Sequence, residues 1–261
     1  MVARSRNRIV KSRPGPQGAQ EIPCESCPLR QMETFRKFTK EELAFISNFK
    51  IGEMTVQAGS TIFLEGHNSP HLFTVLDGWA MRFKILQDGN RQVFNFAFRG
   101  DLLGLQSALF DKMLHSVEAL TDMRLCVFPR ERIWELYHEQ SNLAYDMTWM
   151  AAREESILAQ HLAAVGQMPA LGRIAYLIVF LLHQVRRGGR GNESVISAPI
   201  TQEHIGDAMG LSLVHTNKTI RKLQAMGCIE WQRQVLRVLD EKRLIELSGY
   251  DRQEREERPF L

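Results

Sequence analysis

The sequence contains no apolar run long enough to cross a membrane. Its most apolar stretch, residues 174–182, is much shorter than the roughly 18–20 residues that a transmembrane helix needs, and it predicts a buried helix instead. The first 20 residues also lack the apolar segment of a secretory signal peptide. We therefore expect a cytoplasmic protein that does not enter a membrane.

Motifs of catalysis are absent as well. The chain has no paired carboxylates in a motif, no nucleophile elbow, no phosphate-binding loop and no His-Glu-x-x-His. A catalytic set assembled only by folding would leave no such mark, but the sequence itself favours no enzyme. With 261 residues, of which 44% are hydrophobic and 24% are charged, the chain has the composition of an ordinary soluble protein with room for two domains.

Acidic residues are missing from the first 20 positions. Five cations precede Glu21, the first acidic residue: Arg4, Arg6, Arg8, Lys11 and Arg13. Together with the prolines and glycines among them, they predict a disordered basic arm over residues 1–21, which either touches DNA phosphates or stays in solvent. The net charge of only +3 argues against a general polyanion binder.

Short β-prone runs recur between residues 50 and 128. Turn signals separate these runs, and Asp88-Gly89 between two of them is a strong hairpin signal. The runs cover residues 54–57, 61–64, 71–76, 79–86, 92–98, 116–119 and 124–128. This spacing predicts a jelly-roll β-barrel, which we place in a sensor domain over residues 22–129.

Residues 130–166 have the periodicity of a long helix. One seam recurs at spacings close to three and four and contains Met147, Met150, Glu154, Ile157 and His161. Such a seam usually packs on its own domain. Its length, and its place between a barrel and a further domain, make a dimer interface the second interpretation. Another helix is expected over residues 170–184.

Residues 200–227 have the form of a helix-turn-helix, with a tight turn at Gly210. Thr201 and Ser212 are good N-caps for its two helices. The second helix is expected to bury the side that carries Leu213, Thr216, Ile220 and Leu223. Its outer side then carries His215, Lys218, Arg221 and Lys222. Such helix pairs also occur in other all-α domains, but a cationic outer face suits the major groove of DNA.

Two further β-prone runs follow at residues 228–231 and 235–239, around the polar turn Gln232-Arg233-Gln234. They predict the hairpin of a winged helix, closed by a last helix over residues 241–247. We therefore place a winged helix-turn-helix domain at residues 167–250 and a charged tail at residues 251–261. The expected fold class is α+β, with a barrel, a long helix over residues 130–166 and a C-terminal DNA-binding domain.

This order of parts resembles the CRP/FNR family of bacterial transcription regulators. The resemblance rests on Gly78 after a strand, on the Gly-Asp-Leu-Leu-Gly run at residues 100–104, and on the helix-turn-helix. It implies a cyclic-nucleotide-binding-like barrel, a dimerisation helix and a homodimer on a two-fold symmetric site in double-stranded DNA. Two recognition helices would enter major grooves about 34 Å apart. RNA polymerase is a further partner that the resemblance implies.

The cyclic-AMP branch of the family holds its nucleotide with a Glu and an Arg-Ser pair. Here the Glu position is Leu105, and residues 109–117 contain no Arg. Lys112 and His115 are poor substitutes for the bidentate fork that a buried phosphate favours. We therefore expect no binding of cyclic AMP, and the barrel either holds another ligand or only transmits a signal.

The cysteines resemble those of the oxygen-sensing, FNR-like branch. That branch holds an iron–sulfur cluster with three N-terminal cysteines and one cysteine in the last barrel strand. Cys24, Cys27 and Cys126 match three of these four positions, and the remaining position is Glu33, a weaker ligand. Cys228 is expected to be structural.

The same cysteines allow other interpretations. Cys126 could be a small core residue, the three thiols could bind Zn with a further ligand, and Cys24 and Cys27 could form a reversible disulfide. We therefore carry two hypotheses. One is a regulator with a redox, oxygen or nitric-oxide input. The other is a regulator without a cofactor, controlled by its abundance or by a small ligand in the barrel.

The residues that would touch DNA follow from the position of the second helix and from the resemblance. The candidates for base contacts are Val214, Asn217 and Lys218. Val can contact a thymine methyl, Asn can pair with adenine and Lys can reach guanine. The candidates for phosphate contacts are Ser212, His215 and Arg221, and the start of the first helix adds Thr201 and Gln202 to the predicted interface.

Overall fold

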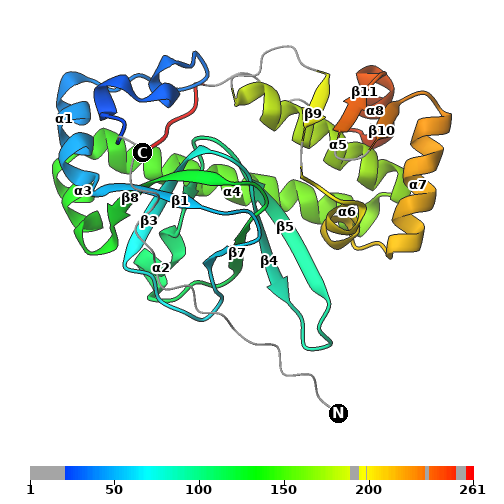
Figure 1. Ribbon diagram of the computed structural model, residues 1–261, viewed down its shortest axis with the longest axis horizontal. Helices are drawn as coiled ribbons and strands as arrows, with labels where there is room; N and C mark the ends of the chain where they lie inside the picture. Colours follow the sequence, from blue (N-terminus) through cyan, green and yellow to red (C-terminus); the bar gives the residue numbers. More distant parts are fainter. Residues whose placement is uncertain (1–20, 189–193, 198, 233–234, 251–256) are drawn as a thin grey trace.

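The computed structural model describes residues 21–188, 194–197, 199–232, 235–250 and 257–261. A β-barrel and a smaller, mainly helical domain lie side by side, and the long helix α4 runs past the barrel toward the helical domain (Figure 1). None of the helices in these ranges is both long enough and apolar enough to span a membrane. The predicted basic arm, apart from Glu21, lies outside the described residues.

Short helical pieces precede the barrel. The turns η1 (Cys24–Ser26) and η2 (Pro28–Gln31) carry the Cys-x-x-Cys, and α1 (Lys40–Phe49) follows. A capping box starts α1, because the Thr39 hydroxyl accepts from the Glu42 amide and the Glu42 carboxylate accepts from the Thr39 amide. Phe49 then stacks on Phe128 at a centroid distance of 5.5 Å, which fixes α1 on the last barrel strand.

Two four-stranded antiparallel sheets form the barrel, with strand orders β1-β8-β3-β6 and β2-β7-β4-β5. The strands are β1 (Gly52–Val56), β2 (Thr61–Phe63), β3 (His71–Asp77), β4 (Ala80–Ile85), β5 (Arg91–Ala97), β6 (Leu102–Leu103), β7 (Ser116–Ala119) and β8 (Met123–Pro129). The predicted β-barrel is therefore confirmed. The short strand β6 and the helix α2 (Leu105–Phe110) after it are additions that the sequence did not reveal.

The region after the barrel forms three helical pieces rather than one helix. They are η3 (Arg130–Arg132), α3 (Ile133–Glu139) and α4 (Ser141–Gln167). Gln140 separates α3 from α4, because its φ of −132° and ψ of 78° lie outside the helical region. The predicted continuous helix over residues 130–166 is wrong in its first part. After Pro169 comes α5 (Ala170–Arg187), which is buried on most of its surface.

The predicted seam of α4 faces the chain itself. Met147, Ile157 and His161 are buried. Met147 and Met150 pack in the apolar cluster around α1 and α3, whereas Ile157 joins the cluster around α5. Glu154 is ion-paired with an arginine of β4 at 2.9 Å. These contacts lie within one chain, so the seam is not a free surface for a second copy. Periodicity alone could not decide this, because both kinds of interface have the same helical period.

The C-terminal domain is a winged helix-turn-helix, as predicted. Its elements are β9 (Val195–Ser197), α6 (Gln202–Met209), α7 (Leu213–Ala225), β10 (Ile229–Gln232), β11 (Val235–Val238) and α8 (Glu241–Ser248). The three strands form one sheet of order β10-β11-β9, in which β9 was not predicted. Helices α6, α7 and α8 all contact α5, which forms the centre of the domain. Residues 233–234 of the predicted turn lie outside the described residues.

The end of the chain differs from the predicted charged tail. Residues 251–256 lie outside the described residues, but residues 258–261 are buried. They lie beside the α1 end of the molecule, far from α7 (Figure 1). Phe260 and Leu261 join the apolar cluster that contains Phe35 and Phe38. The charged residues that precede this apolar end concealed it in the sequence.

Two buried histidines are uncharged in the folded protein at neutral pH. His161 lies between α4 and α5, where its Nδ1 is 2.8 Å from the Tyr176 hydroxyl and 3.1 Å from the Ile157 carbonyl oxygen. Burial lowers the pKa of His161 to about 4. In the barrel, burial and then neighbouring cations lower the pKa of His115 to about 3.

These histidines predict a loss of stability in mild acid. In the unfolded chain each side chain binds a proton near its ordinary pKa of about 6.5, whereas the folded protein resists protonation. The free energy of unfolding is therefore highest above about pH 6.5 and falls below it, by up to about 1.4 kcal/mol per pH unit for each group. Urea unfolding at pH 7.5 and at pH 5 measures this fall.

The substitution His161→Gln should make the fall shallower, because glutamine does not titrate. His67→Gln, at an exposed histidine of the barrel, is the matched control and should leave the fall unchanged. An equal pH dependence in the parent and the His161→Gln variant would contradict this assignment.

Candidate nucleic-acid interface and cysteine cluster

The turn between α6 and α7 holds the two helices close together. Gly210 ends α6 in the left-handed region at φ +64°, a conformation that favours glycine. The Leu211 amide then donates to the Gly206 carbonyl oxygen at 3.0 Å. A Cβ atom at Gly206 would stand 2.7 Å from the Leu211 carbonyl oxygen, so this position also excludes a side chain. The two glycines therefore set how α7 rests on α6.

Both helices begin at the predicted caps. The Thr201 hydroxyl accepts from the His204 amide at 3.2 Å, and the Ser212 hydroxyl accepts from the His215 amide at 3.3 Å. Each cap satisfies one of the four amides that a helix leaves without a partner at its N-terminus. The start of α7 is thus defined to the residue.

One side of α7 is buried on the domain through Thr216, Ile220 and Leu223. Leu213 was predicted to share that side, but it is 51% exposed, so this prediction is wrong. Leu213 is the first residue of the helix, and burial of α7 begins only at Thr216, one turn later. The spacing identified the buried side correctly, but the rest of the described domain does not pack against the first turn of α7.

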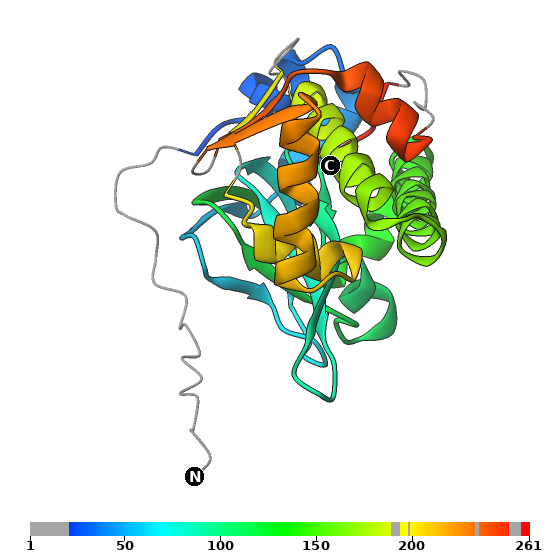
Figure 2. The same ribbon diagram turned by 90° about the vertical axis from the view of Figure 1, so that its right-hand side faces the viewer.

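The opposite side of α7 is exposed and free of negative charge. Val214, Lys218 and Arg221 are all exposed at spacings that place them on one face, Val214 to 79%. Asn217 is half-buried at one edge of this face, and His215 is exposed at the other edge. The helix has no acidic residue. It stands at the outer edge of the molecule in Figure 1 and faces the viewer in Figure 2.

A hairpin of the barrel braces α6 from the other side. Arg91 of β5 is ion-paired with Asp207 at 2.7 Å, and the Gln92 side-chain amide donates to the Ala208 carbonyl oxygen at 3.2 Å. The position of α7 therefore depends on the barrel as well as on its own domain. The sequence offered no signal for this contact, because the partners are more than 100 residues apart.

The structure brings three cysteines to one place, called here the cysteine cluster. Cys126 is buried in β8, and Cys24 and Cys27 pack against the same apolar cluster. Burial raises the pKa of the Cys126 thiol to about 12 and also raises the pKa of the Cys24 thiol. These two thiols are therefore protonated at neutral pH. Cys228 is buried in the other domain, away from this cluster.

A cation and a carboxylate stand beside the cysteine cluster. Lys50, directly after α1, donates through Nζ to the Ile22 carbonyl oxygen at 2.8 Å and to the Glu53 carboxylate at 2.6 Å. The charge of Lys50 opposes the rise of the thiol pKa values of Cys24 and Cys126. No spacing in the sequence connects Lys50 or Glu53 with the Cys-x-x-Cys, so only the fold reveals them.

As it stands, the cysteine cluster does not fit an iron–sulfur cluster with four ligands. Glu33, the candidate for the fourth ligand, is exposed. Over the residues that the structure describes, no group of three or more His, Cys, Asp or Glu side chains is arranged to hold a metal ion. The charged groups beside the thiols are the Lys50 ammonium, which is no ligand while protonated, and the Glu53 carboxylate. That carboxylate already accepts from Lys50, from the Ile22 amide and from Arg124. The described residues therefore supply thiols without a free fourth ligand.

The barrel interior contains an arginine that sequence reasoning missed. Arg82 of β4 is buried, donates to the Leu102 carbonyl oxygen at 3.1 Å and pairs with Glu154 of α4 at 2.9 Å. The Asn95 side-chain amide donates to the same carboxylate at 2.6 Å. Leu105, where the cyclic-AMP branch has a Glu, begins α2. The guanidinium of Arg82 is thus engaged by the chain's own oxygens.

Two known domain families match the chain. The cyclic nucleotide-binding domain matches residues 53–140, and the Crp-like helix-turn-helix domain matches residues 172–247. The fold and these matches define a DNA-binding transcription regulator with a barrel of the cyclic-nucleotide-binding type. The chain belongs to the CRP/FNR family of bacterial transcription regulators.

Relatives and a solved structure agree with this family. The transcriptional activator protein FnrL of Cereibacter sphaeroides is 25% identical over 233 residues, which are 87% of this chain and 92% of the relative. The nitrogen fixation regulation protein FixK of Bradyrhizobium diazoefficiens is 26% identical over 228 residues, 87% of this chain and 94% of the relative. The structure of FixK2 from Bradyrhizobium japonicum has a TM-score of 0.66 at 24% identity, and covers 77% of this chain and 98% of its own.

Proposed function

We propose that the protein binds a two-fold symmetric DNA site as a homodimer and regulates transcription in response to a signal at its cysteine cluster. The observation that carries the DNA interface is the exposed side of α7, which is cationic and free of acidic residues. In this interface the side chains that face bases are Val214, Asn217 and Lys218. The side chains that contact phosphates are Ser212, His215 and Arg221, together with Thr201 and Gln202 at the start of α6.

Lys218→Ala should weaken binding to the specific site by about 1–3 kcal/mol and relax the choice of base at one position. The physical reason is that its ammonium reaches the edge of a base as well as the backbone. Fluorescence anisotropy measures this with a site selected from random DNA, with its single-base variants and with unselected DNA at one salt concentration.

Lys242→Ala is the matched control for this experiment, because Lys242 is an exposed lysine on α8. It should bind the selected site like the parent protein. An equal loss on selected and unselected DNA would make Lys218 a phosphate contact, and the proposed base contact would be withdrawn.

The homodimer is proposed to form through the exposed side of α4 instead of the buried seam. Residues on that side recur at spacings of three and four: Thr148, Ala151, Glu155, Leu158 and Leu162. Leu158 is 36% exposed and Leu162 is 73% exposed in the single chain. Exposed leucines in register on a helix of 27 residues favour burial against a second copy.

Leu162→Glu should shift the protein from dimer to monomer, with a dimer dissociation constant raised at least about tenfold. A carboxylate at this position would be buried without a partner in the dimer, and in the monomer it would stay in water. Sedimentation equilibrium measures the dissociation constant. Leu239→Glu, at an exposed leucine after β11, is the control that should leave it unchanged. A Leu162→Glu protein that stays dimeric would rule out this face.

The input is proposed to act at the cysteine cluster. Three thiols and the Lys50 ammonium share one site where the N-terminal segment meets α1 and β8, so oxidation or nitrosation of a thiol changes the packing of the cysteine cluster. The alternative is a regulator without a cofactor, controlled by its abundance or by a small ligand in the barrel. Cyclic AMP is not proposed as a ligand, because Arg82 is engaged by Glu154. RNA polymerase is the proposed partner in transcription.

Protein purified without oxygen should lack matched iron and acid-labile sulfide, because Glu33 is exposed and the Glu53 carboxylate beside the thiols is bound by Lys50 and Arg124. Visible absorption near 400 nm, with iron and sulfide assays, measures this. DNA affinity should still change when a mild thiol oxidant is added, and Cys24→Ala should abolish the change. Cys228→Ala, at a buried cysteine outside the cluster, should retain it. Matched iron and sulfide that are lost in Cys24→Ala would restore the iron–sulfur hypothesis.

A further inference from the structure

We propose that residues 257–261 form a strap that docks on residues 34–38, directly after the segment that carries Cys24 and Cys27, and controls how firmly that segment is held. The strap comes from the DNA-binding domain, whose last helix α8 ends at Ser248. It lies at the opposite end of the molecule, next to the N-terminal segment (Figure 1). Docking of the strap stands on its own contacts, and only its effect on DNA binding rests on the proposed function.

The main chain of the strap pairs with residues 34–38, called here the junction. The Arg258 amide donates to the Thr34 carbonyl oxygen at 2.9 Å, and the Arg36 amide donates to the Arg258 carbonyl oxygen at 2.9 Å. Phe35 and Arg258 thereby form a parallel β-bridge. The strap is thus joined to the junction by hydrogen bonds that any side chain permits.

Side chains of the strap provide the specificity of this contact. The ring of Phe260 stacks on Phe38 at a centroid distance of 4.8 Å and meets the edge of Phe35 at 5.1 Å. The Arg258 guanidinium lies over the Phe35 ring at 5.5 Å and forms an ion pair with Asp101 in the barrel. Phe260 and Leu261 are both almost fully buried, so the loss of apolar surface from water stabilises the docked strap.

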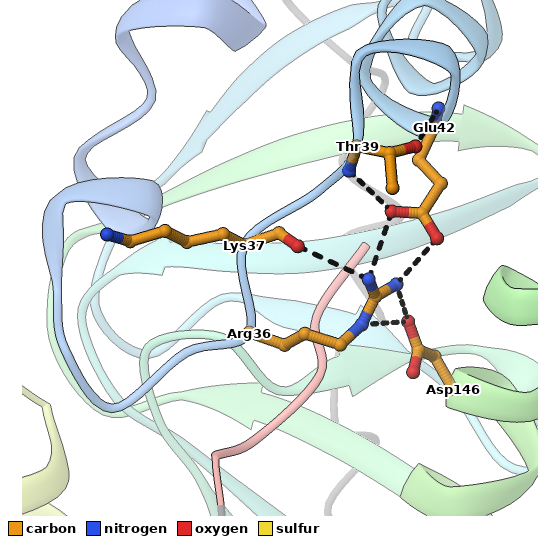
Figure 3. Close-up of polar contacts among 5 residues, drawn as sticks. All are labelled: Arg36, Lys37, Thr39, Glu42 and Asp146. Atoms are coloured by element: carbon orange, nitrogen blue, oxygen red, sulfur yellow. Dashed lines mark hydrogen bonds and ion pairs between the residues drawn. The ribbon is translucent and has the colours of Figure 1, made fainter.

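The junction under the strap contacts four other parts of the protein: the barrel, α1, α4 and α5. The Phe35 ring lies on Gly100, where a Cβ atom would stand 2.2 Å from its Cζ. The Thr34 hydroxyl donates to the Arg187 carbonyl oxygen at the end of α5, at 3.0 Å. Arg36 joins Glu42 of α1 to Asp146 of α4, with 3.0 Å from Nη1 to the Glu42 carboxylate (Figure 3). Movement of the junction therefore reaches the barrel, α4 and α5 together.

Release of the strap would uncover Phe35 and Phe38. These rings belong to the apolar cluster against which Cys24 and Cys27 pack, so the loss of the strap loosens the packing around both thiols.

Thiol accessibility tests the strap in the full chain. Arg258→Ala and a chain shortened by residues 257–261 should each react with a thiol reagent at Cys24 and Cys27 at least tenfold faster than the parent. Glu257→Ala, at the exposed residue of the strap, is the control and should react like the parent. Peptide mapping assigns each rate to its cysteine, and Cys228 in the other domain shows whether a variant is folded.

A synthetic peptide with the sequence Glu-Glu-Arg-Pro-Phe-Leu completes the test. Added to the shortened chain, it should bind and bring the rates at Cys24 and Cys27 back toward those of the parent, and the same peptide with Ala in place of Phe should fail. If the shortened chain does not fold, the peptide cannot rescue it. The test then rests on Arg258→Ala, provided that Cys228 stays unreactive in this variant and so shows that it is folded. Unchanged rates in the folded variants would overturn the strap.

None of these measurements uses DNA or an oxidant of the regulator. If the thiol rates change as expected while oxidation leaves DNA binding unchanged, the proposed input is disproved and the strap proposal still holds.

Discussion

One apolar cluster runs without a break from the barrel into the DNA-binding domain, and the arrangement of the whole chain depends on it. Met81 and Phe96 of the barrel, Phe180 of α5 and Leu223 of α7 belong to this single cluster. Phe98 meets Phe180 edge to face at a centroid distance of 6.5 Å, where the two domains join. Because close-packed interiors resist sliding, α7 has a set orientation relative to the barrel. A signal at the barrel can therefore reach α7 as a movement of packed elements.

Local patterns in the sequence were sufficient for most of the fold. The strands and the helix-turn-helix depend on period, turn residues and caps that lie within a few positions, such as Asp88-Gly89, Thr201 and Gly210. Local patterns could not predict what packs against α4, because the partners lie far away in the sequence. Its buried seam includes Glu154, an unfavourable residue for a core until Arg82, far away in the sequence, pairs with it. A period says which residues share a face, but not what covers that face.

The candidate sites were predictable to the same extent. The helical period predicted the exposed side of α7 correctly. Only Leu213 in the first turn differs, because no other described part of the domain packs over that turn. At the cysteines, the residue types indicated a shared site, whereas Lys50 and Glu53 entered it only through folding. Arg258 is a similar case, since nothing in the charged C-terminal sequence indicates that it forms an ion pair with Asp101 of the barrel. Long-range electrostatic partners are specified by topology, and local sequence carries little trace of them.

The outer face of α7 rests on no other part of the described chain, and this has a consequence for how regulators of this build diverge. Val214, Lys218 and Arg221 point into solvent in the free protein, while the packing of the helix is secured by residues on its opposite side. Exchanges at exposed helix positions usually change stability by less than about 0.5 kcal/mol. In the proposed interface, substitutions at these positions can therefore change the target sequence without compensating changes in the barrel or the wing. The choice of DNA sequence can change at this face while the stability of the fold stays the same.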